Sequence, residues 1–352
     1  MNDQSKQFLF DLLLSASPSG FEEPAARIWR TEAESFADEV TVDNNGNSVA
    51  RLRGDGPKVV IEGHIDEIGL LISYIDDDGY IWFTPVGGWD DQILTGQRVR
   101  IVGANGPVPG VIGRRPAHLL STEDRGKASQ IKDLWIDIGA TSGEQARERV
   151  SIGDPIVIEQ PIVDLGNNRI AGRGVDNRMG AWIALETLRA LSSKRPAADV
   201  YAVAAVQEEI TFLGARTSAF SLDPDVAVVL DVTHATDHPE ADKRGQGDVR
   251  IGGGPVLSRR ATVNPRVFQR FAELARADEI PFAVEAAGRS TGTDADAIAP
   301  ARGGVPTAVV SVANRYMHSP NEVISLDDLD AAVRLIALFV ADLGDSTDFT
   351  RR

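Results

Sequence analysis

Five places in the sequence set an acid or a histidine at the end of an apolar run or beside the start of a helix. They are His64 with Asp66, Asp176, the pair Glu208-Glu209, Asp231, and His318. His64 follows the run VVIEG, Glu208 follows YAVAAVQ, and Asp231 follows VAVVL. In a doubly wound sheet, ligands bind at the carboxyl ends of the strands. If these runs are strands of one such sheet, we expect all of these side chains to meet at the same edge.

These residue types are the ones that a site with two divalent ions requires. Two ions about 3.5 to 4 Å apart need a bridging carboxylate, further nitrogen and oxygen ligands, and an open position for water. The site also needs a base that is not bound to metal, and two adjacent glutamates can divide these roles. An acid two residues from a ligating histidine can fix the orientation of its ring. The chain has no cysteine and only five histidines, so any metal must be held by histidine and carboxylate.

Each candidate also has a purely structural alternative. Asp176 could cap a helix, Asp231 could cap a turn, and His64 or His318 could pack as ordinary structural histidines, His318 beside Tyr316. Adjacent glutamates are usually solvated, although Glu208-Glu209 follows a run with almost no polar residue. The functional interpretation depends on all of them occurring at the expected edge of one sheet.

The elements that would position these residues alternate between helix and strand. We expect helices over residues 4–15, 22–36, 177–191, 212–220, 265–277 and 326–343, and strands over residues 39–42, 48–53, 58–62, 199–206, 226–232, 282–285 and 307–312. Such alternation predicts an α/β fold: a doubly wound mixed sheet with helices on both faces.

Residues 69–161 follow a different pattern. Short β-type runs alternate there with turn residues such as Asp78-Gly79, Gly87-Gly88 and Asn105-Gly106, and the one helical stretch expected covers residues 142–149. This pattern is typical of a small β-barrel or sandwich. We therefore expect a catalytic α/β domain made of residues 1–68 and 162–352, with residues 69–161 as an inserted, barrel-like β domain.

Composition excludes several classes of protein. Among the 352 residues, 52 acids against 36 bases give a net charge of −16, which argues against a nucleic-acid binder and against a basic helix on a membrane surface. No apolar run approaches the roughly 20 residues of a membrane span. The first residues, MNDQSKQFLFDLLLSA, make a poor signal peptide because Asp11 interrupts the apolar run. We expect a cytoplasmic protein.

Taken together, the motifs resemble the tetrahedral aminopeptidase family, the glutamyl and deblocking aminopeptidases with a two-metal site. The likeness rests on the segments HIDEIGL, GRGVDNRMG, VQEEITFLGA, LDVTHATD, STGTDADAI and YMHSPNEV, with SPSGFEEP, RRPAHLL and DLWIDIGA in support. It extends over about residues 8–342 in the family's order.

The resemblance implies a role for each candidate. Asp176 would bridge two divalent ions, zinc or cobalt with manganese as an alternative. His64 and Glu209 would complete the coordination of one ion, and Asp231 and His318 that of the other. Glu208 would be the general base, and Asp66 would stand behind His64. The substrates would be short peptides cleaved at their N-termini, and the inserted domain would build a hollow homododecamer from dimers.

Several alternatives stay open. Asp294 could line a substrate pocket or cap a helix, His118 could be structural or reach a neighbouring subunit's site, and His234 and His238 could be solvated loop residues. A metal-dependent deacylase of N-acyl amino acids or peptides would use the same ions and base. A noncatalytic metal-binding scaffold would have no need of an unligated acid at Glu208.

Overall fold

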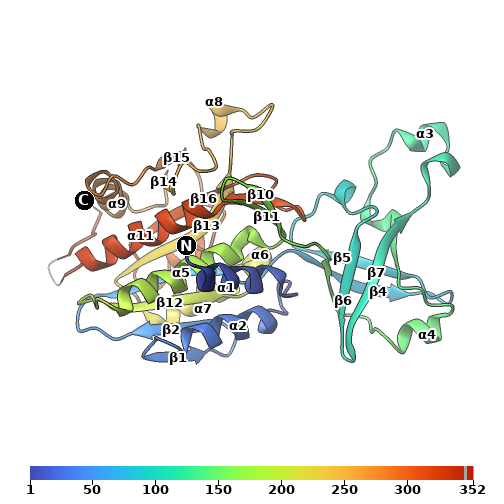
Figure 1. Ribbon diagram of the computed structural model, residues 1–352, viewed down its shortest axis with the longest axis horizontal. Helices are drawn as coiled ribbons and strands as arrows, with labels where there is room; N and C mark the ends of the chain where they lie inside the picture. Colours follow the sequence, from blue (N-terminus) through green and yellow to red (C-terminus); the bar gives the residue numbers. More distant parts are fainter. Residues whose placement is uncertain (345–346, 352) are drawn as a thin grey trace.

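The computed structural model describes residues 1–344 and 347–351, with residue 124 described by its backbone alone. A central sheet of eight strands has the order β1-β2-β12-β3-β13-β16-β14-β15 (Figure 1). Their bounds are β1 Glu39–Val42, β2 Ser48–Leu52, β12 Asp199–Ala205, β3 Lys58–His64, β13 Val226–His234, β16 Thr307–Asn314, β14 Val256–Arg260 and β15 Ala283–Ala287. The four strands β12, β3, β13 and β16 are parallel, whereas β2 and β14 pair antiparallel to their inner neighbours. The predicted mixed sheet is confirmed.

Helices cover both faces of this sheet, as predicted. One face packs against α1 (Asp3–Leu14), α2 (Glu23–Ala33), α5 (Val175–Ser192), α9 (Pro265–Ala277) and α11 (Leu326–Asp342). The other face packs against α7 (Leu213–Leu222) and α10 (Ala295–Ile298). The short helix α6 (Glu208–Thr211) follows β12, and α8 (Lys243–Gln246) lies in the long connection between β13 and β14. The central strands read as continuous apolar runs because both of their faces are buried.

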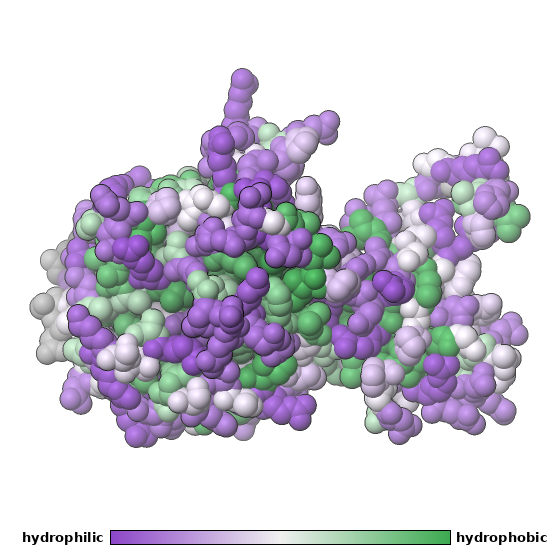
Figure 2. Space-filling view, viewed as in Figure 1, coloured by the Kyte–Doolittle hydropathy of each residue, from purple (hydrophilic) through white to green (hydrophobic). Residues whose placement is uncertain are grey.

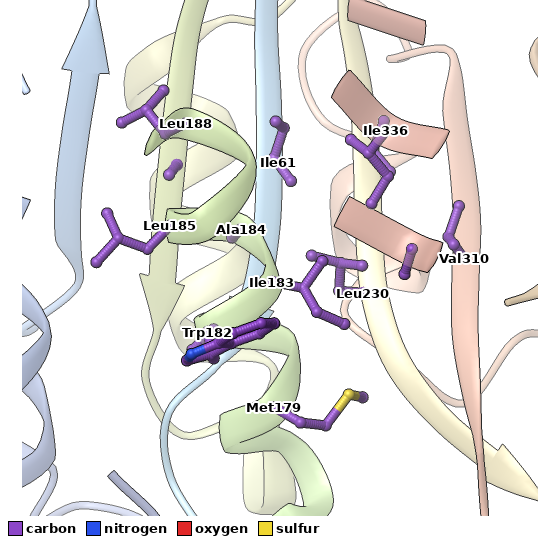
Figure 3. Packing of buried hydrophobic residues seen from close by; sticks show 14 of the residues in the cluster. Ile61, Met179, Trp182, Ile183, Ala184, Leu185, Leu188, Leu230, Val310 and Ile336 are labelled. Carbon is purple, nitrogen blue, oxygen red and sulfur yellow. The ribbon is translucent and has the colours of Figure 1, made fainter. Parts of the chain in front are cut away.

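Helix α5 lies closest to the sheet. Ile183 extends from it toward Leu230 of β13 (Figure 3), and Trp182 and Leu185 belong to the same buried cluster. A side-chain carbon at Gly63 would stand only 2.4 Å from the backbone of Gly180 in α5. The absence of a side chain at Gly63 therefore lets the helix approach β3 directly beside His64.

Residues between β3 and α5 form a second body, seen at one end of the molecule in Figure 1. Six strands close into a barrel in the order β4-β5-β8-β7-β6-β9. Their bounds are β4 Gly69–Ile75, β5 Ile81–Val86, β8 Leu134–Asp137, β7 Gly106–Arg114, β6 Arg98–Gly103 and β9 Pro155–Ile158. Connections contain α3 (Thr122–Arg125), α4 (Gly143–Arg147) and the 3₁₀ turns Asp91–Ile93, Ala117–Leu119 and Ile131–Asp133. The barrel has its own apolar core, and on the side shown in Figure 2 apolar residues gather where the two bodies meet.

A third, three-stranded sheet was not predicted. It has the order β10-β11-β17, with β10 Val163–Gly166, β11 Arg169–Gly172 and β17 Glu322–Ser325. Each strand has four residues and β10 is fully exposed, so apolar alternation could not reveal them. In its register, Gly172 lies opposite Glu322.

Within the described ranges, no helix combines the length and apolar character that crossing a bilayer demands.

Candidate active site

The four parallel central strands bring the predicted residues to one edge of the sheet. His64 is the last residue of β3 and pairs with Ala205, the last residue of β12. Glu208 and Glu209 open helix α6 just beyond β12. Asp231 lies inside β13 rather than at its end, because that strand continues to His234. His318 follows β16.

Asp176 stands between the two histidines. Its Oδ1 lies 3.3 Å from Nε2 of His64, and its Oδ2 lies 3.5 Å from Nε2 of His318. Asp176 and Asn177 have non-helical backbone angles at a kink near the start of α5, and it is Oδ1 of Asn177 that accepts the N–H of Gly180 at 3.2 Å. The alternative that Asp176 is a helix cap is therefore wrong.

Two sets of potential ligand atoms share this aspartate. His64, Asp176 and Asp231 have ligand atoms within 4.8 Å of one another, and so do Asp176, Glu209 and His318. A further set joins His64 to Glu208 and Glu209, but among the described residues none joins Asp231 to His318. These sets favour a grouping of Asp231 with His64 and of Glu209 with His318, in place of the grouping that the resemblance implied.

Carboxylates outnumber imidazoles at this edge. Burial disfavours the charged form of His64, yet the nearby carboxylates of Glu208 and Asp66 outweigh it and raise the His64 pKa well above its ordinary value. Burial, opposed by His64 and reinforced by Asp176, raises the pKa of Glu208 to about 7. Burial and Asp176 also raise the pKa of Glu209 and Asp231 well above theirs. Such a concentration of buried negative charge is stabilised by cations.

The donor set fits divalent cations that accept nitrogen and oxygen ligands. Two imidazole Nε2 atoms face three carboxylates from separate elements. Oε1 of Glu209 is buried and has no hydrogen-bond partner among the described residues. A buried carboxylate oxygen without a partner is costly, and coordination to a metal would satisfy it. Zinc, cobalt and manganese all accept such ligands.

Asp66 is positioned behind His64. Its side chain is completely buried, and Oδ1 lies 3.3 Å from Nδ1 of His64. The two oxygens also accept the backbone N–H groups of Glu208 and Glu209, each at 3.2 Å. One carboxylate therefore contacts both the histidine and the turn that carries the paired glutamates.

Glu322 is a site residue that the sequence analysis did not identify. Its Oε2 accepts the backbone N–H of Asp176 at 3.1 Å, and its Oε1 accepts that of His318 at 3.2 Å. The only sequence signal is its place four residues after His318. The pairing of β17 with β11, which was not predicted, places Glu322 beside the segment that leads to Asp176.

A cleft of about 370 Å³ opens from the metal-ligand candidates. Its remaining wall comprises Phe212, Val232, Thr233, His234, Arg260, Glu285, Thr291, Gly292, Thr293 and Met317. Arg260 and Glu285 form an ion pair in this wall. The cleft supplies a space beside the carboxylates in which a substrate can lie.

The structure places the four other residues that the sequence analysis singled out, Asp294, His118, His234 and His238, in different surroundings. Asp294 neither lines the cleft nor caps α10 through its side chain, and both of its oxygens are buried without a partner among the described residues. His234 lines the cleft, at the end of β13. His238 contacts the carbonyl of Pro239, and His118 is exposed on a barrel connection.

The sequence and the fold have close counterparts among known proteins. The family model of the M42 glutamyl aminopeptidases matches residues 46–335. A lysyl aminopeptidase of Pyrococcus furiosus is 35% identical over 342 residues, which cover 96% of this chain and 97% of the relative. The crystal structure of a TET aminopeptidase from a marine sediment archaeon of the Thaumarchaeota superposes with a TM-score of 0.93, at 35% identity and 97% coverage of both chains.

A further structure concerns assembly. The TET1 peptidase of Pyrococcus horikoshii, described as assembling into a tetrahedron or a large octahedral shell, superposes with a TM-score of 0.86 at 31% identity, covering 96% of this chain and all of that one. The predicted family and the predicted aminopeptidase activity are both confirmed by these comparisons. The chain belongs to the M42 glutamyl aminopeptidase family and is a metal-dependent aminopeptidase, an enzyme that hydrolyses peptide bonds.

Proposed function

We propose that this aminopeptidase removes N-terminal residues from short peptides at a pair of divalent ions, zinc or cobalt, centred on Asp176. The observation that carries the proposal is that the two oxygens of Asp176 face two different imidazoles. His64 and Asp231 would hold one ion, and Glu209 and His318 the other. When bound, such ions lower the pKa of water and polarise a carbonyl oxygen.

Glu208 is the proposed general base. Its Oε2 lies 3.6 Å from Nε2 of His64, so it borders the ligand set from the end of β12. A carboxylate at this place can take a proton and release it again. In this mechanism Glu208 takes a proton from the attacking water and passes it to the nitrogen of the leaving amine.

The remaining residues orient this machinery. Asp66 holds the ring of His64 and the turn of Glu208 and Glu209. The surplus of carboxylates gives the free α-amino group of a substrate a counter-charge. This interaction restricts cleavage to the end of a peptide chain.

Assembly belongs to the same proposal. Residues 69–161 would serve as an inserted domain that joins subunits into a homododecamer built from dimers. The assembly reported for the related TET1 peptidase supports this expectation. The boundaries at residues 68 and 162 and the cytoplasmic location expected from the sequence remain predictions.

The test is hydrolysis of a panel of aminoacyl-anilides and their N-acetylated counterparts by protein stripped with a chelator and then loaded separately with zinc, cobalt or manganese. We expect activity only after loading and only on substrates with a free amine. Hydrolysis by fully stripped protein would exclude a metal mechanism. Faster hydrolysis of the acetylated substrates would instead identify a deacylase.

A further inference from the structure

The loop that follows β5 contains Gly87, Gly88 and Trp89, and its backbone lies beside the candidate metal site. A side-chain carbon at Gly87 would stand 3.4 Å from Oε2 of Glu209. One at Gly88 would stand 3.2 Å from Nδ1 of His318. Because neither residue has a side chain, the loop packs directly against two of the proposed ligands. Sequence analysis identified Gly87-Gly88 only as turn residues.

His318 presents its two ring nitrogens to different bodies of the molecule. Nε2 lies 3.5 Å from both Asp176 and Glu209, within the α/β body. Nδ1 faces the Gly88 backbone, where an added side-chain carbon would meet it. A histidine that ligates through one nitrogen is oriented by the hydrogen bond that its other nitrogen makes.

His318 needs this contact more than His64 does. The side chain of His64 is 2% exposed and has Asp66 beside its Nδ1, whereas the side chain of His318 is 37% exposed. Packing therefore confines the ring of His64 on every side but leaves that of His318 partly free. The Gly88 backbone lies beside Nδ1 of His318, as the carboxylate of Asp66 lies beside Nδ1 of His64.

Trp89 fixes the loop in place. Its Nε1 donates a hydrogen bond to the carbonyl of Gly69 at 2.9 Å, and its ring packs against the barrel core. Gly69 begins β4 and follows His64 by five residues, so this bond joins the Gly88 loop to the segment that leaves β3. The same indole lines a small cavity together with Asp176, Glu209 and His318.

We propose that Gly88, held by Trp89, is a positioning residue that orients His318 for metal binding, so that the barrel completes the metal site of the α/β body. The inference rests on the proposed function, because it requires His318 to be a ligand. It adds a role for the barrel within each subunit.

Two variants test the proposal by different changes. Gly88→Ala adds one methyl group 3.2 Å from Nδ1 of His318, at a residue without positive φ, so the backbone is not strained. Trp89→Phe keeps an aromatic ring and removes only the N–H that bonds Gly69. Gly303→Ala is the matched control, because nothing lies within 4 Å of the added carbon and φ is not positive there. His318→Ala reports whether the histidine is a ligand at all.

The measurement is titration of stripped protein with Co²⁺, followed by visible absorption, which reports coordination whether or not the enzyme turns over. Thermal unfolding of the stripped variants verifies that each is folded. We expect Gly88→Ala to bind the ion at His318 about 10- to 100-fold more weakly, Trp89→Phe about fivefold more weakly, and Gly303→Ala like wild type.

The outcomes separate the two proposals. If His318→Ala loses an ion while folded Gly88→Ala and Trp89→Phe both bind it as tightly as wild type does, the positioning role is wrong and the proposed function stands. If His318→Ala itself binds cobalt like wild type, the metal assignment fails and the inference fails with it. A loss in Trp89→Phe alone would still support the proposal should Gly88→Ala fail to fold.

Discussion

The carboxylate of Glu322 accepts the backbone N–H of Asp176 at 3.1 Å, and the glutamate is almost completely buried. Its other oxygen accepts the N–H of His318. A single side chain thus sets the separation between the residue proposed to bridge the ions and a residue proposed to bind one of them. The oxygen that accepts from His318 also accepts from Nδ2 of Asn314 at 3.4 Å, so both oxygens must be acceptors, which a carboxylate provides.

Glu322→Gln should therefore weaken metal binding and stability together. The new amide group would face a backbone N–H, leaving one buried donor unpaired at a cost of about 1 to 3 kcal/mol. Chemical unfolding of stripped protein measures the stability, and Co²⁺ titration measures the binding. Glu34→Gln, at an exposed position, is the control, and equal behaviour of the two variants would contradict the role given to Glu322.

Glu208→Gln should retain metal and lose turnover. The substitution keeps the size of the side chain and removes its capacity to take a proton, so we expect the rate to fall by at least about a hundredfold. Metal content measured on the purified variant should match that of wild type. A variant that keeps its activity would remove Glu208 from the position of general base.

Asp66→Asn should act through His64. An amide lacks the negative charge beside Nδ1 and can accept only one of the N–H groups of Glu208 and Glu209. We expect metal affinity to fall about 10- to 100-fold, as measured by competition with a chromogenic chelator. Asp55→Asn, at an exposed position, should leave the affinity unchanged.

Glu22 should make stability depend on pH. Burial, with the nearby Asp66, raises the Glu22 pKa from 4.5 to about 7. Between these values the folded chain holds a proton that the unfolded chain releases, so stability falls as pH rises through this window, by up to about 3 kcal/mol. Glu22→Gln keeps Oε1, which accepts the N–H groups of Gly20 and Gln207. Urea unfolding of stripped protein from pH 4.5 to 8 should show a shallower decline for the variant.

Much of the fold and of the candidate site follows from the sequence. The apolar runs VVIEG and VAVVL define β3 and β13, and parallel strands present their carboxyl ends together, so His64 and Asp231 could be expected at one edge. The helices and the barrel were likewise predictable from periodicity and turn residues.

Contacts between distant segments could not be predicted in this way. The backbone of Gly88 lies beside the side chain of His318, and the side chain of Glu322 accepts the backbone N–H of Asp176. Each contact joins residues that are far apart in the sequence, and neither leaves a pattern in composition or spacing. The order of the motifs likewise does not specify which acid lies beside which histidine. The distances between the side chains favour Asp231 beside His64, although its strand β13 neighbours both β3 and β16.

The three-stranded sheet limits where insertions and deletions can occur in this part of the chain. The exposed tip of its β10–β11 hairpin is tied to helix α11, because the carbonyl of Asn168 accepts the N–H of Leu326 at 2.8 Å and its side chain donates to Asp327 at 3.1 Å. A one-residue slip between β11 and β17 would turn Glu322 to the opposite face, away from Asp176. A deletion inside either paired strand would therefore disconnect the two halves of the candidate metal site, and a change at Asn168 would reach the first turn of α11.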